Sequence, residues 1–277
     1  ESEDFIFTSS SAAMYEWISF TSDYGLRDPF VGVCHGVIAR IAPRCRVIDI
    51  THGVPPGNIR HGAFVLAQSV GYLPPAVHLA VVDPGVGTAR RGIALFAASG
   101  VLIGPDNGLL LPAAEALGGA QHAVELSSPE LQLHPVSATF HGRDVFAPAA
   151  AHLAAGVDPT EFGPSIPIEQ LHRLPTPAPS VRPGEVVASV ATIDHFGNVQ
   201  LTAPASSLRE AGLTQGMTVV VQRQFTGVVG RTFADVDEDE LVVLSDSAGL
   251  AAIAVNGGSA AQRLGLTGDE QVTISSE

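Results

Sequence analysis

The sequence predicts an α/β N-terminal domain, with a mostly parallel sheet flanked by helices, followed by an all-β C-terminal barrel domain. Short apolar segments alternate with helical patterns in the first half of the chain, which is typical of a parallel sheet covered by helices. A proline-rich segment follows, and after it the patterns are those of strands and turns. The 277 residues are enough for two modest domains.

In the N-terminal domain, buried strands are predicted at Trp17–Thr21, Arg46–Thr51, Val77–Val82 and Ile93–Ala97. A helix separates the first two strands, because apolar residues from Phe30 to Ile41 recur at helical spacing. Asp28 and Pro29 supply the N-cap and first-turn signals for that helix. A second helical pattern covers Ile59–Val70, and a third, rich in alanine, covers Arg143–Ala155.

The proline-rich segment, residues 173–184, is interpreted as a stiff linker between the N-terminal domain (residues 17–172) and the C-terminal domain (residues 185–277). Strands of the C-terminal domain are predicted at Glu185–Ile193, Val199–Thr202, Met217–Gln222, Leu241–Ser245, Leu250–Val255 and Gln271–Ile274. The acidic run Asp235–Glu240 lacks the glycine and spacing of an EF-hand loop. It is interpreted as a solvated hairpin tip.

The charge composition excludes several functions. Net charge is −14, and all 14 cationic side chains are arginines, so mechanisms that need a Schiff-base, P-loop or general-base lysine are excluded. The acidic balance argues against nucleic acid as a partner, since phosphates require a basic surface. Charged residues make up only 15% of the chain, which favours an oligomer whose subunits bury part of each other's surface.

Cysteine usage and hydropathy predict a cytoplasmic protein that does not enter a membrane. Cys34 and Cys45 are too few for a disulfide scaffold and lie beside apolar segments, as buried thiols do in a reducing compartment. The chain contains no apolar run of about 18 residues. Residues 1–13, before Met14, are interpreted as a leader or an expression remnant outside the fold.

Three segments carry polar residues where strands or loops end, and ligands of parallel α/β sheets bind at the carboxyl ends of the strands. The first segment is Phe20–Gly25, in which Asp23 leaves the first strand and is suited to grip vicinal hydroxyls. Asp28 follows five residues later. The competing interpretation is that both aspartates cap turns or the helix.

The second segment is Val81–Gly92, in which Asp83 follows a buried strand and Arg90 follows after a turn bracketed by glycines. The spacing predicts that the carboxylate and the guanidinium fold toward each other across the turn, with Arg91 as the substitute if Arg90 points away. A purely structural ion pair is the competing interpretation.

The third segment is Thr139–Asp144, in which His141 lies in a loop before the alanine-rich helix and Gly142 leaves room for a ligand beside it. His35, in the middle of the first helix, is interpreted as structural. A metal hydrolase with Asp23, Asp83 and His141 as ligands remains an alternative, although a nearby arginine would repel the ion and no paired helical zinc motif is present. Serine hydrolase chemistry is disfavoured, because the chain has no Gly-x-Ser-x-Gly motif.

At these three segments the sequence resembles the SAM hydroxide adenosyltransferases, or adenosine-forming S-adenosyl-L-methionine (SAM) hydrolases, which are related to the SAM-dependent fluorinase and chlorinase. The resemblance extends from about Trp17 to the C-terminus and includes two further motifs, Gly104–Leu110 and Ile193–Asn198. It implies an α/β domain, a β-barrel and a homotrimer with active sites between the N-terminal domain of one subunit and the C-terminal domain of its neighbour. SAM is the implied substrate, with neither a cofactor nor a metal.

The resemblance also assigns site residues. It implies an Asp-Arg-His triad at Asp83, Arg90 and His141, and substrate contacts from two N-terminal aspartates, of which Asp23 would hold the ribose hydroxyls and Asp28 the methionine ammonium. In the C-terminal domain it implies that Phe196 packs on the nucleoside, that Asn198 and Asn256 face the adenine, and that Ser247 faces the methionine carboxylate. The sequence departs from the fluorinase pattern at two positions, Gly57, where that enzyme has tryptophan, and Ala248, where it has arginine.

The triad favours hydrolysis of SAM to adenosine and L-methionine by attack of activated water at C5′ of the ribose. Halogenases of the family carry tyrosine at the positions of Asp83 and His141, whereas Gly142 is chlorinase-like. Three alternatives stay open from the sequence: a SAM-dependent halogenase that makes 5′-halo-5′-deoxyadenosine, a metal-dependent nucleosidase or phosphatase, and a non-catalytic SAM- or adenosine-binding module.

Overall fold

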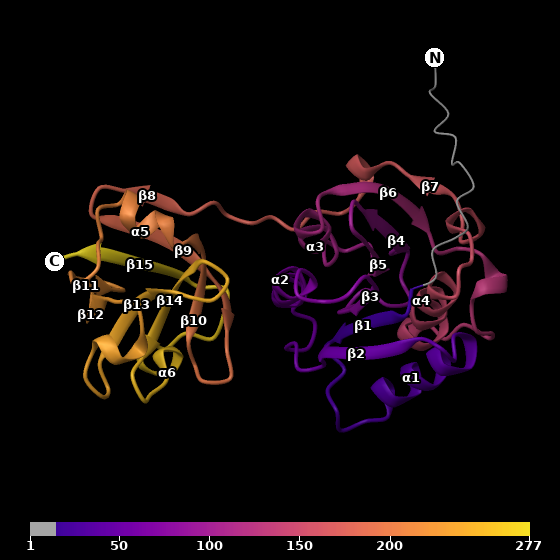
Figure 1. Cartoon of the computed structure of the whole chain (residues 1–277), viewed down its shortest axis with the longest axis horizontal. Helices are drawn as coiled ribbons and strands as arrows, with labels where there is room; N and C mark the ends of the chain where they lie inside the picture. The colour runs from indigo at the N-terminus through magenta and orange to yellow at the C-terminus, as the bar shows by residue number, and fades with distance from the viewer. Residues whose placement is uncertain (1–14) are drawn as a thin grey trace, which may run out of the picture. The chain divides into compact units, whose positions relative to one another are not determined.

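The computed structural model describes residues 15–277, so the leader interpreted at residues 1–13 lies outside the described residues. The chain forms two compact units, and the division falls between Leu174 and Pro175 (Figure 1). The N-terminal unit is an α/β fold and the C-terminal unit is a β-barrel, which confirms the predicted fold class.

The N-terminal unit is built on a sheet in the order β2-β1-β3-β5-β4-β6-β7. Its four neighbouring strands β2, β1, β3 and β5 are parallel, and β4, β6 and β7 extend the sheet in antiparallel fashion. The strands span Trp17–Ser22 (β1), Arg46–Thr51 (β2), Ala76–Val81 (β3), Gly92–Ala97 (β4), Gly100–Pro105 (β5), Ala120–Glu125 (β6) and Ser165–Ile166 (β7).

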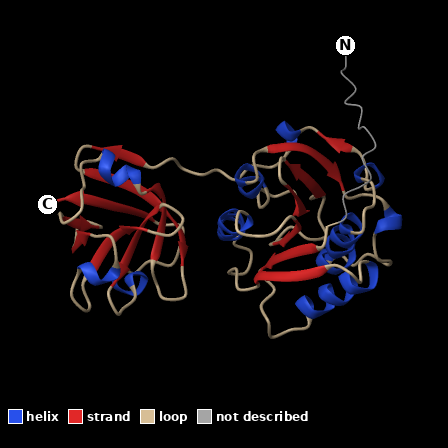
Figure 2. Cartoon of the chain, in the orientation of Figure 1, coloured by secondary structure: helices blue, strands red, loops and turns tan. Residues whose placement is uncertain are grey.

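Helices cover both faces of this sheet (Figures 1 and 2). Helices α1 (Phe30–Ile41) and α4 (Ala147–Ala154) pack together in one apolar core, which contains the fully buried Phe20 and Phe146. Helices α2 (Ile59–Val70) and α3 (Leu111–Ala116) belong to a second core on the other face. Short 3-10 turns occur at Pro129–Leu131, Pro159–Glu161 and Ile168–Gln170.

One local prediction in this unit is correct only in part, and a second is wrong. The helix predicted at Arg143–Ala155 is a π-helical turn, Gly142–Phe146, followed by α4. Pro148 lies in the first turn of α4 and has no N–H to donate backward, so the regular helix begins beside it rather than at Arg143. The N-cap position of α1 is occupied by Pro29, and no side chain forms a capping hydrogen bond there. Asp28 therefore does not cap this helix.

The C-terminal unit is an eight-stranded sheet in the order β10-β14-β13-β12-β11-β15-β9-β8, and pairing of β10 with β9 closes it into a barrel. The strands span Ser180–Arg182 (β8), Glu185–Ile193 (β9), Val199–Pro204 (β10), Thr218–Val221 (β11), Phe225–Val229 (β12), Leu241–Ser245 (β13), Leu250–Val255 (β14) and Gln271–Ser276 (β15). Short helices occur at Ser206–Glu210 (α5) and Ala260–Leu264 (α6).

The structure corrects two predictions for the second half of the chain. The linker predicted at residues 173–184 is shorter, because Ser180–Arg182 pairs with β9 as an edge strand, where flanking prolines are tolerated. The run Asp235–Glu240 is not a hairpin tip. It belongs to the connection between β12 and β13, which are parallel and therefore cannot be joined by a tight hairpin, and a 3-10 turn at Phe233–Asp235 begins this part of the connection.

None of the helices in residues 15–277 combines the length and the apolar character that crossing a bilayer requires.

Candidate active site

A cavity of about 180 Å³ opens in the N-terminal unit beside the carboxyl ends of β1 and β3. It lies where parallel α/β sheets bind their ligands. Residues from all three predicted segments line it, together with part of the loop after β2; the lining consists of Asp23, Tyr24, Gly57, Asp83, Pro84, Val86, Thr139, His141 and Gly142.

Arg90 joins Asp83 to His141 at this cavity. Its Nε donates to Asp83 Oδ1 over 3.0 Å and its Nη2 donates to Asp83 Oδ2 over 2.5 Å, which is a bidentate ion pair. The same Nη2 lies 3.0 Å from His141 Nδ1. Both members of the ion pair are buried, and the guanidinium also lies 5.2 Å from the ring centre of Phe146.

Tight turns bring the three groups together. After β3, the Val86 N–H donates to the Asp83 carbonyl and the Thr88 N–H donates to the Gly85 carbonyl, which folds the chain back so that Arg90 faces Asp83. Gly87 has a φ of +77°, and a Cβ there would lie 2.2 Å from the Ala138 carbonyl oxygen. Glycine at this position therefore allows the Asp83–Arg90 turn to lie against the loop that carries His141.

The buried carboxylate of Asp144 holds that loop from the other side. Its Oδ2 accepts a hydrogen bond from the Ser137 N–H over 2.8 Å, and its backbone carbonyl accepts from the Leu133 N–H over 2.9 Å. Arg143 Nε donates to Asp144 Oδ1 over 2.7 Å. His141 therefore sits between a fixed loop and the π-helical turn, an element frequent at functional sites.

Burial shapes the protonation of the site. Burial lowers the pKa of the His141 imidazole, and the positive charge of Arg90 lowers it further, while the negative charge of Asp83 opposes both. The ring is therefore neutral at neutral pH, with Nδ1 free of a proton because it accepts from Arg90. Burial raises the pKa of the Asp83 carboxyl. The charge and hydrogen bonds of Arg90 lower it, but the net pKa stays above the usual value.

The three residues predicted as ligands of a metal hydrolase do not lie close enough together to share one ion. Among residues 15–277, the group of His, Cys, Asp or Glu ligand atoms close enough to share one ion is His35, Asp49 and His52. Asp23, Asp83 and His141 do not form such a group, and the guanidinium of Arg90 lies between the latter two.

Arg91 points away from the triad. Its Nε and Nη2 donate to Asp106 Oδ2 over 3.0 and 2.6 Å, and Nη2 also donates to the Gln170 carbonyl. The neighbouring Asn107 donates to the Val82 carbonyl, directly before Asp83. The motif Gly104–Leu110 thus supports the strand end that carries Asp83, and Arg91 is not a substitute for Arg90.

The two predicted N-terminal substrate aspartates differ in position. Asp23 lines the cavity, and its Oδ2 accepts a hydrogen bond from the Gly57 N–H over 2.8 Å. Asp28 is exposed before α1 and is not part of the cavity lining. The structure therefore brings Asp23, but not Asp28, next to Asp83 and His141.

Tyr24 is a cavity residue that sequence reasoning missed. A Cβ at position 142 would lie 2.0 Å from the Tyr24 hydroxyl oxygen, so this hydroxyl occupies the space beside Gly142 that was predicted to receive a ligand. The Tyr24 ring also packs on Phe30 and Phe140, with ring centres 5.9 and 5.8 Å away. Its position directly after Asp23, at a strand end, was the available signal.

The predicted residues of the C-terminal unit fall at two places on the barrel. Phe196 and Asn198 lie between β9 and β10, and Asn256 follows β14; they share one end because the start of β10 pairs with the end of β14. Ser247 lies at the other end of β14, in the turn after β13.

These residues differ in how far they are free to meet a ligand. Phe196 is 74% exposed, and Ser247 is exposed as well. The Asn198 amide donates to Asp194 over 2.8 Å, and the Asn256 amide donates to the Val236 carbonyl over 2.9 Å. Each side-chain amide therefore keeps its carbonyl oxygen and one N–H for a ligand.

A larger hollow of about 430 Å³ lies beside the amino-terminal ends of β1 and β2, where Tyr15, Glu16 and Arg44–Arg46 line it. Ligand sites of parallel sheets form at the opposite, carboxyl ends of the strands. The smaller cavity is therefore the candidate active site.

Comparisons with known proteins cover both units. The family model described as the SAM hydroxide adenosyltransferase N-terminal domain matches residues 18–163, and the C-terminal domain model matches residues 188–273. A curated relative from Salinispora arenicola, named (R)-S-adenosyl-L-methionine hydrolase, is 56% identical over 258 residues, covering 93% of this chain and 97% of the relative.

A fluorinase from Actinoplanes sp. is 29% identical over 290 residues, covering 93% of this chain and 96% of the fluorinase. The crystal structure of an uncharacterized conserved protein from Thermotoga maritima matches with a TM-score of 0.87 and 38% sequence identity, covering 93% of this chain and 99% of that chain. Sequence similarity is thus greater to the hydrolase than to the fluorinase.

Proposed function

The chain belongs to the SAM hydroxide adenosyltransferase family, and from this membership we propose that it hydrolyses (R)-S-adenosyl-L-methionine to adenosine and L-methionine. One observation carries the proposal: Arg90 bridges the Asp83 carboxylate and the unprotonated Nδ1 of His141 at a cavity. A positive charge and a proton acceptor side by side are what water requires to become a nucleophile.

The substrate itself supplies the leaving group. Its sulfonium makes C5′ of the ribose electrophilic and leaves as neutral methionine, so no acid has to protonate it. The protein must supply the nucleophile, and bulk water, with a pKa of about 15.7, is a poor one. The buried cation of Arg90 lowers the cost of building negative charge on the attacking oxygen.

In the proposed step, a water molecule takes the place of the direct hydrogen bond between Arg90 and His141. It accepts from Arg90 Nη2 and donates to His141 Nδ1, while Arg90 keeps both bonds to Asp83. The oxygen forms a bond to C5′ as the C5′–S bond breaks, sulfur takes the electron pair, and the proton passes to His141. Asp83 orients the guanidinium throughout.

Hydrolysis is favoured over halogenation by the two positions that distinguish the branches of the family. By the family resemblance, Asp83 and His141 stand where the halogenases carry tyrosine. In addition, the hydrolase relative is 56% identical whereas the fluorinase is 29% identical. A non-catalytic binding module would not require a proton acceptor against the buried cation.

We assign the remaining roles from the family resemblance. Asp23 holds the ribose hydroxyls and Asp28 the methionine ammonium. The C-terminal unit supplies Phe196 to the nucleoside, Asn198 and Asn256 to the adenine, and Ser247 to the methionine carboxylate. The two units of one site would come from neighbouring subunits of a homotrimer, which acts in the cytoplasm without a cofactor or metal.

Incubation with each sulfonium epimer of SAM tests this proposal. We expect adenosine and methionine in equal amounts from the R epimer, at a rate that chelator does not change, and no 5′-halo nucleoside when chloride or fluoride is added. A halogenated product would establish the halogenase, and loss of activity with chelator would establish a metal enzyme. Saturable binding of SAM without any adenosine would establish a binding module.

The pH dependence should report on His141. Because burial and Arg90 lower its pKa, the imidazole stays unprotonated below the usual value of about 6.5. A base works in this form, so kcat/KM is expected to be constant near neutral pH and to fall only at more acidic pH, with a midpoint below about 6.5. A kcat/KM profile from pH 4 to pH 9 measures it. A midpoint above the usual value would contradict the assignment.

A further inference from the structure

The turn Ser22–Gly25 carries Asp23 and Tyr24 to the cavity, and the loop after β2 holds this turn at several points. The Gly25 N–H donates to the His52 carbonyl over 2.8 Å, and the Gly57 N–H donates to Asp23 Oδ2 over 2.8 Å. The Tyr24 N–H donates to Ser22 Oγ over 3.2 Å. The position of Asp23 therefore depends in part on Ser22 and His52, which do not line the cavity.

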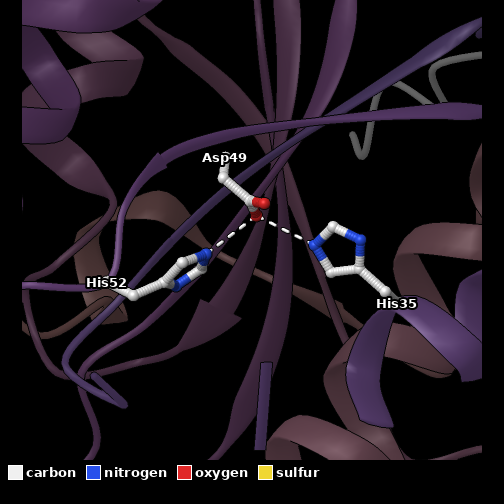
Figure 3. Close-up of side chains that lie close together, drawn as sticks. All are labelled: His35, Asp49 and His52. Carbon is white, nitrogen blue, oxygen red and sulfur yellow. Dashed lines mark hydrogen bonds and ion pairs between the residues drawn. The ribbon is translucent and has the colours of Figure 1, made fainter. Parts of the chain in front are cut away.

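Ser22 is itself the inner end of a chain of hydrogen bonds. Its hydroxyl lies 2.6 Å from His52 Nδ1, and His52 Nε2 lies 2.8 Å from Asp49 Oδ1. His35 Nε2 lies 2.9 Å from the same oxygen, so the carboxylate of Asp49 lies between the two rings (Figure 3). Ser22 and His52 are buried, whereas Asp49 and His35 are partly exposed.

One tautomer of His52 gives every donor in this series of hydrogen bonds an acceptor. With the proton on Nε2, His52 donates to Asp49 and accepts from the Ser22 hydroxyl at Nδ1, which leaves the serine oxygen to accept from Tyr24. Burial raises the pKa of Asp49, but hydrogen bonds from His52 and His35 outweigh it, and the net pKa is lowered. The negative charge on Asp49 fixes the tautomer of His52.

Distances favour hydrogen bonds over a shared metal ion at His35, Asp49 and His52. Nitrogen and oxygen ligands at 2.0–2.1 Å from a tetrahedral metal lie roughly 3.3 Å apart. The two nitrogen–oxygen separations here are 2.9 and 2.8 Å, which are hydrogen-bond lengths.

We infer that Asp49, His52 and Ser22 form a positioning network, which fixes the turn Ser22–Gly25 and thereby the carboxylate of Asp23 against the substrate. The network touches neither the cavity nor the reacting atoms, so it acts on substrate binding rather than on the chemical step. This role rests on the proposed function, because Asp23 is taken to hold the ribose hydroxyls.

The same strand contains a matched control. Ser19 on β1 is fully buried, and its hydroxyl lies 2.8 Å from Nδ1 of the buried His78, which resembles the Ser22–His52 pair. Burial lowers the pKa of His78 to about 4, so the ring of His78 is neutral at neutral pH. Neither Ser19 nor His78 lines the cavity. Ser19→Ala therefore removes a comparable hydrogen bond without touching the turn.

Two measurements on Ser22→Ala and Ser19→Ala test the network. In Ser22→Ala we expect amide hydrogen exchange at residues 23–25 to accelerate at least tenfold, and KM for the substrate to rise about tenfold with kcat changed less than threefold. In Ser19→Ala, exchange at these amides and KM should stay within twofold of wild type, although both variants lose thermal stability. Asp49→Asn, which alters a partly exposed carboxylate, should shift both quantities in the direction of Ser22→Ala.

Unchanged exchange at residues 23–25 in both Ser22→Ala and Asp49→Asn would overturn the network, as would equal effects of Ser19→Ala and Ser22→Ala on KM. If Ser22→Ala does not fold, Asp49→Asn alone decides by the same two readouts. The exchange measurement requires no substrate. Lack of turnover by the wild type would therefore refute the proposed function without bearing on the link from Asp49 to the turn.

Discussion

His141→Ala is expected to lower kcat by about 10²–10⁴-fold while the Kd for the substrate changes only a few-fold. The imidazole accepts a proton only as the oxygen attacks C5′, so its loss removes stabilisation from the transition state and little from the bound substrate. Single-turnover kinetics measure the chemical step, and calorimetric titration measures binding.

His134→Ala is the matched control for this variant. His134 lies in the same region of the chain and bonds to the Pro129 carbonyl, and it is not part of the cavity lining. Its replacement should leave kcat unchanged. Wild-type turnover in His141→Ala would show that the proton goes elsewhere, and a parallel loss of binding would show that the imidazole holds substrate rather than acting on water.

Arg90→Ala is expected to lower turnover by about 10³-fold or more and to destabilise the fold by about 3–5 kcal/mol. The loss of stability arises because Asp83, whose side chain is 5% exposed, keeps a buried charge without its partner. Denaturant unfolding gives the free energy, and adenosine formation gives the activity.

A double variant separates the catalytic role of this ion pair from a structural one. Asp83→Leu with Arg90→Met replaces both charges by apolar groups and should recover most of the stability, because paired removal leaves no uncompensated charge. It should not recover turnover. Arg91→Ala, which breaks the ion pair with Asp106, should cost stability and leave kcat within a few-fold. Turnover in the double variant would mean that the pair only supports the fold.

Much of the N-terminal unit follows from local patterns. The helices at Phe30–Ile41 and Ile59–Val70 and the strand at Arg46–Thr51 have the predicted bounds, because their apolar periodicity and their burial agree. The strand β5 was missed, although it is wholly buried; it follows β4 after a tight turn, so the two were not separated as a hairpin.

The candidate site was predictable where one short turn brings residues together, and not where distant segments meet. Asp83 and Arg90 are seven residues apart across a turn marked by glycines, so their pairing could be expected. The contact between Tyr24 and Gly142 joins residues far apart in the sequence, and the residue types alone do not indicate it. His52 was missed because its partners Ser22 and Asp49 lie on two different strands.

The residues assigned only through family resemblance lie outside the cavity of the N-terminal unit. Asp28 was expected beside the substrate, and its exposed position before α1 gives it no contact with the cavity in the N-terminal unit. Phe196, Asn198, Asn256 and Ser247 lie on a separate unit, so their roles remain proposals. Phe196→Ala should raise KM about tenfold if the exposed ring packs on the nucleoside. An unchanged KM, measured by steady-state kinetics, would remove it from the site.

The origin of the 5′-oxygen of the product tests the central claim most directly. Purified protein is incubated with (R)-S-adenosyl-L-methionine in ¹⁸O-labelled water, and the masses of the products are measured by mass spectrometry. Attack of water at C5′ predicts adenosine that carries one ¹⁸O atom, together with unlabelled methionine, and a loss of this product in His141→Ala. Methylthioadenosine, free adenine or label in the amino acid fragment would place the reaction at another bond and contradict the mechanism.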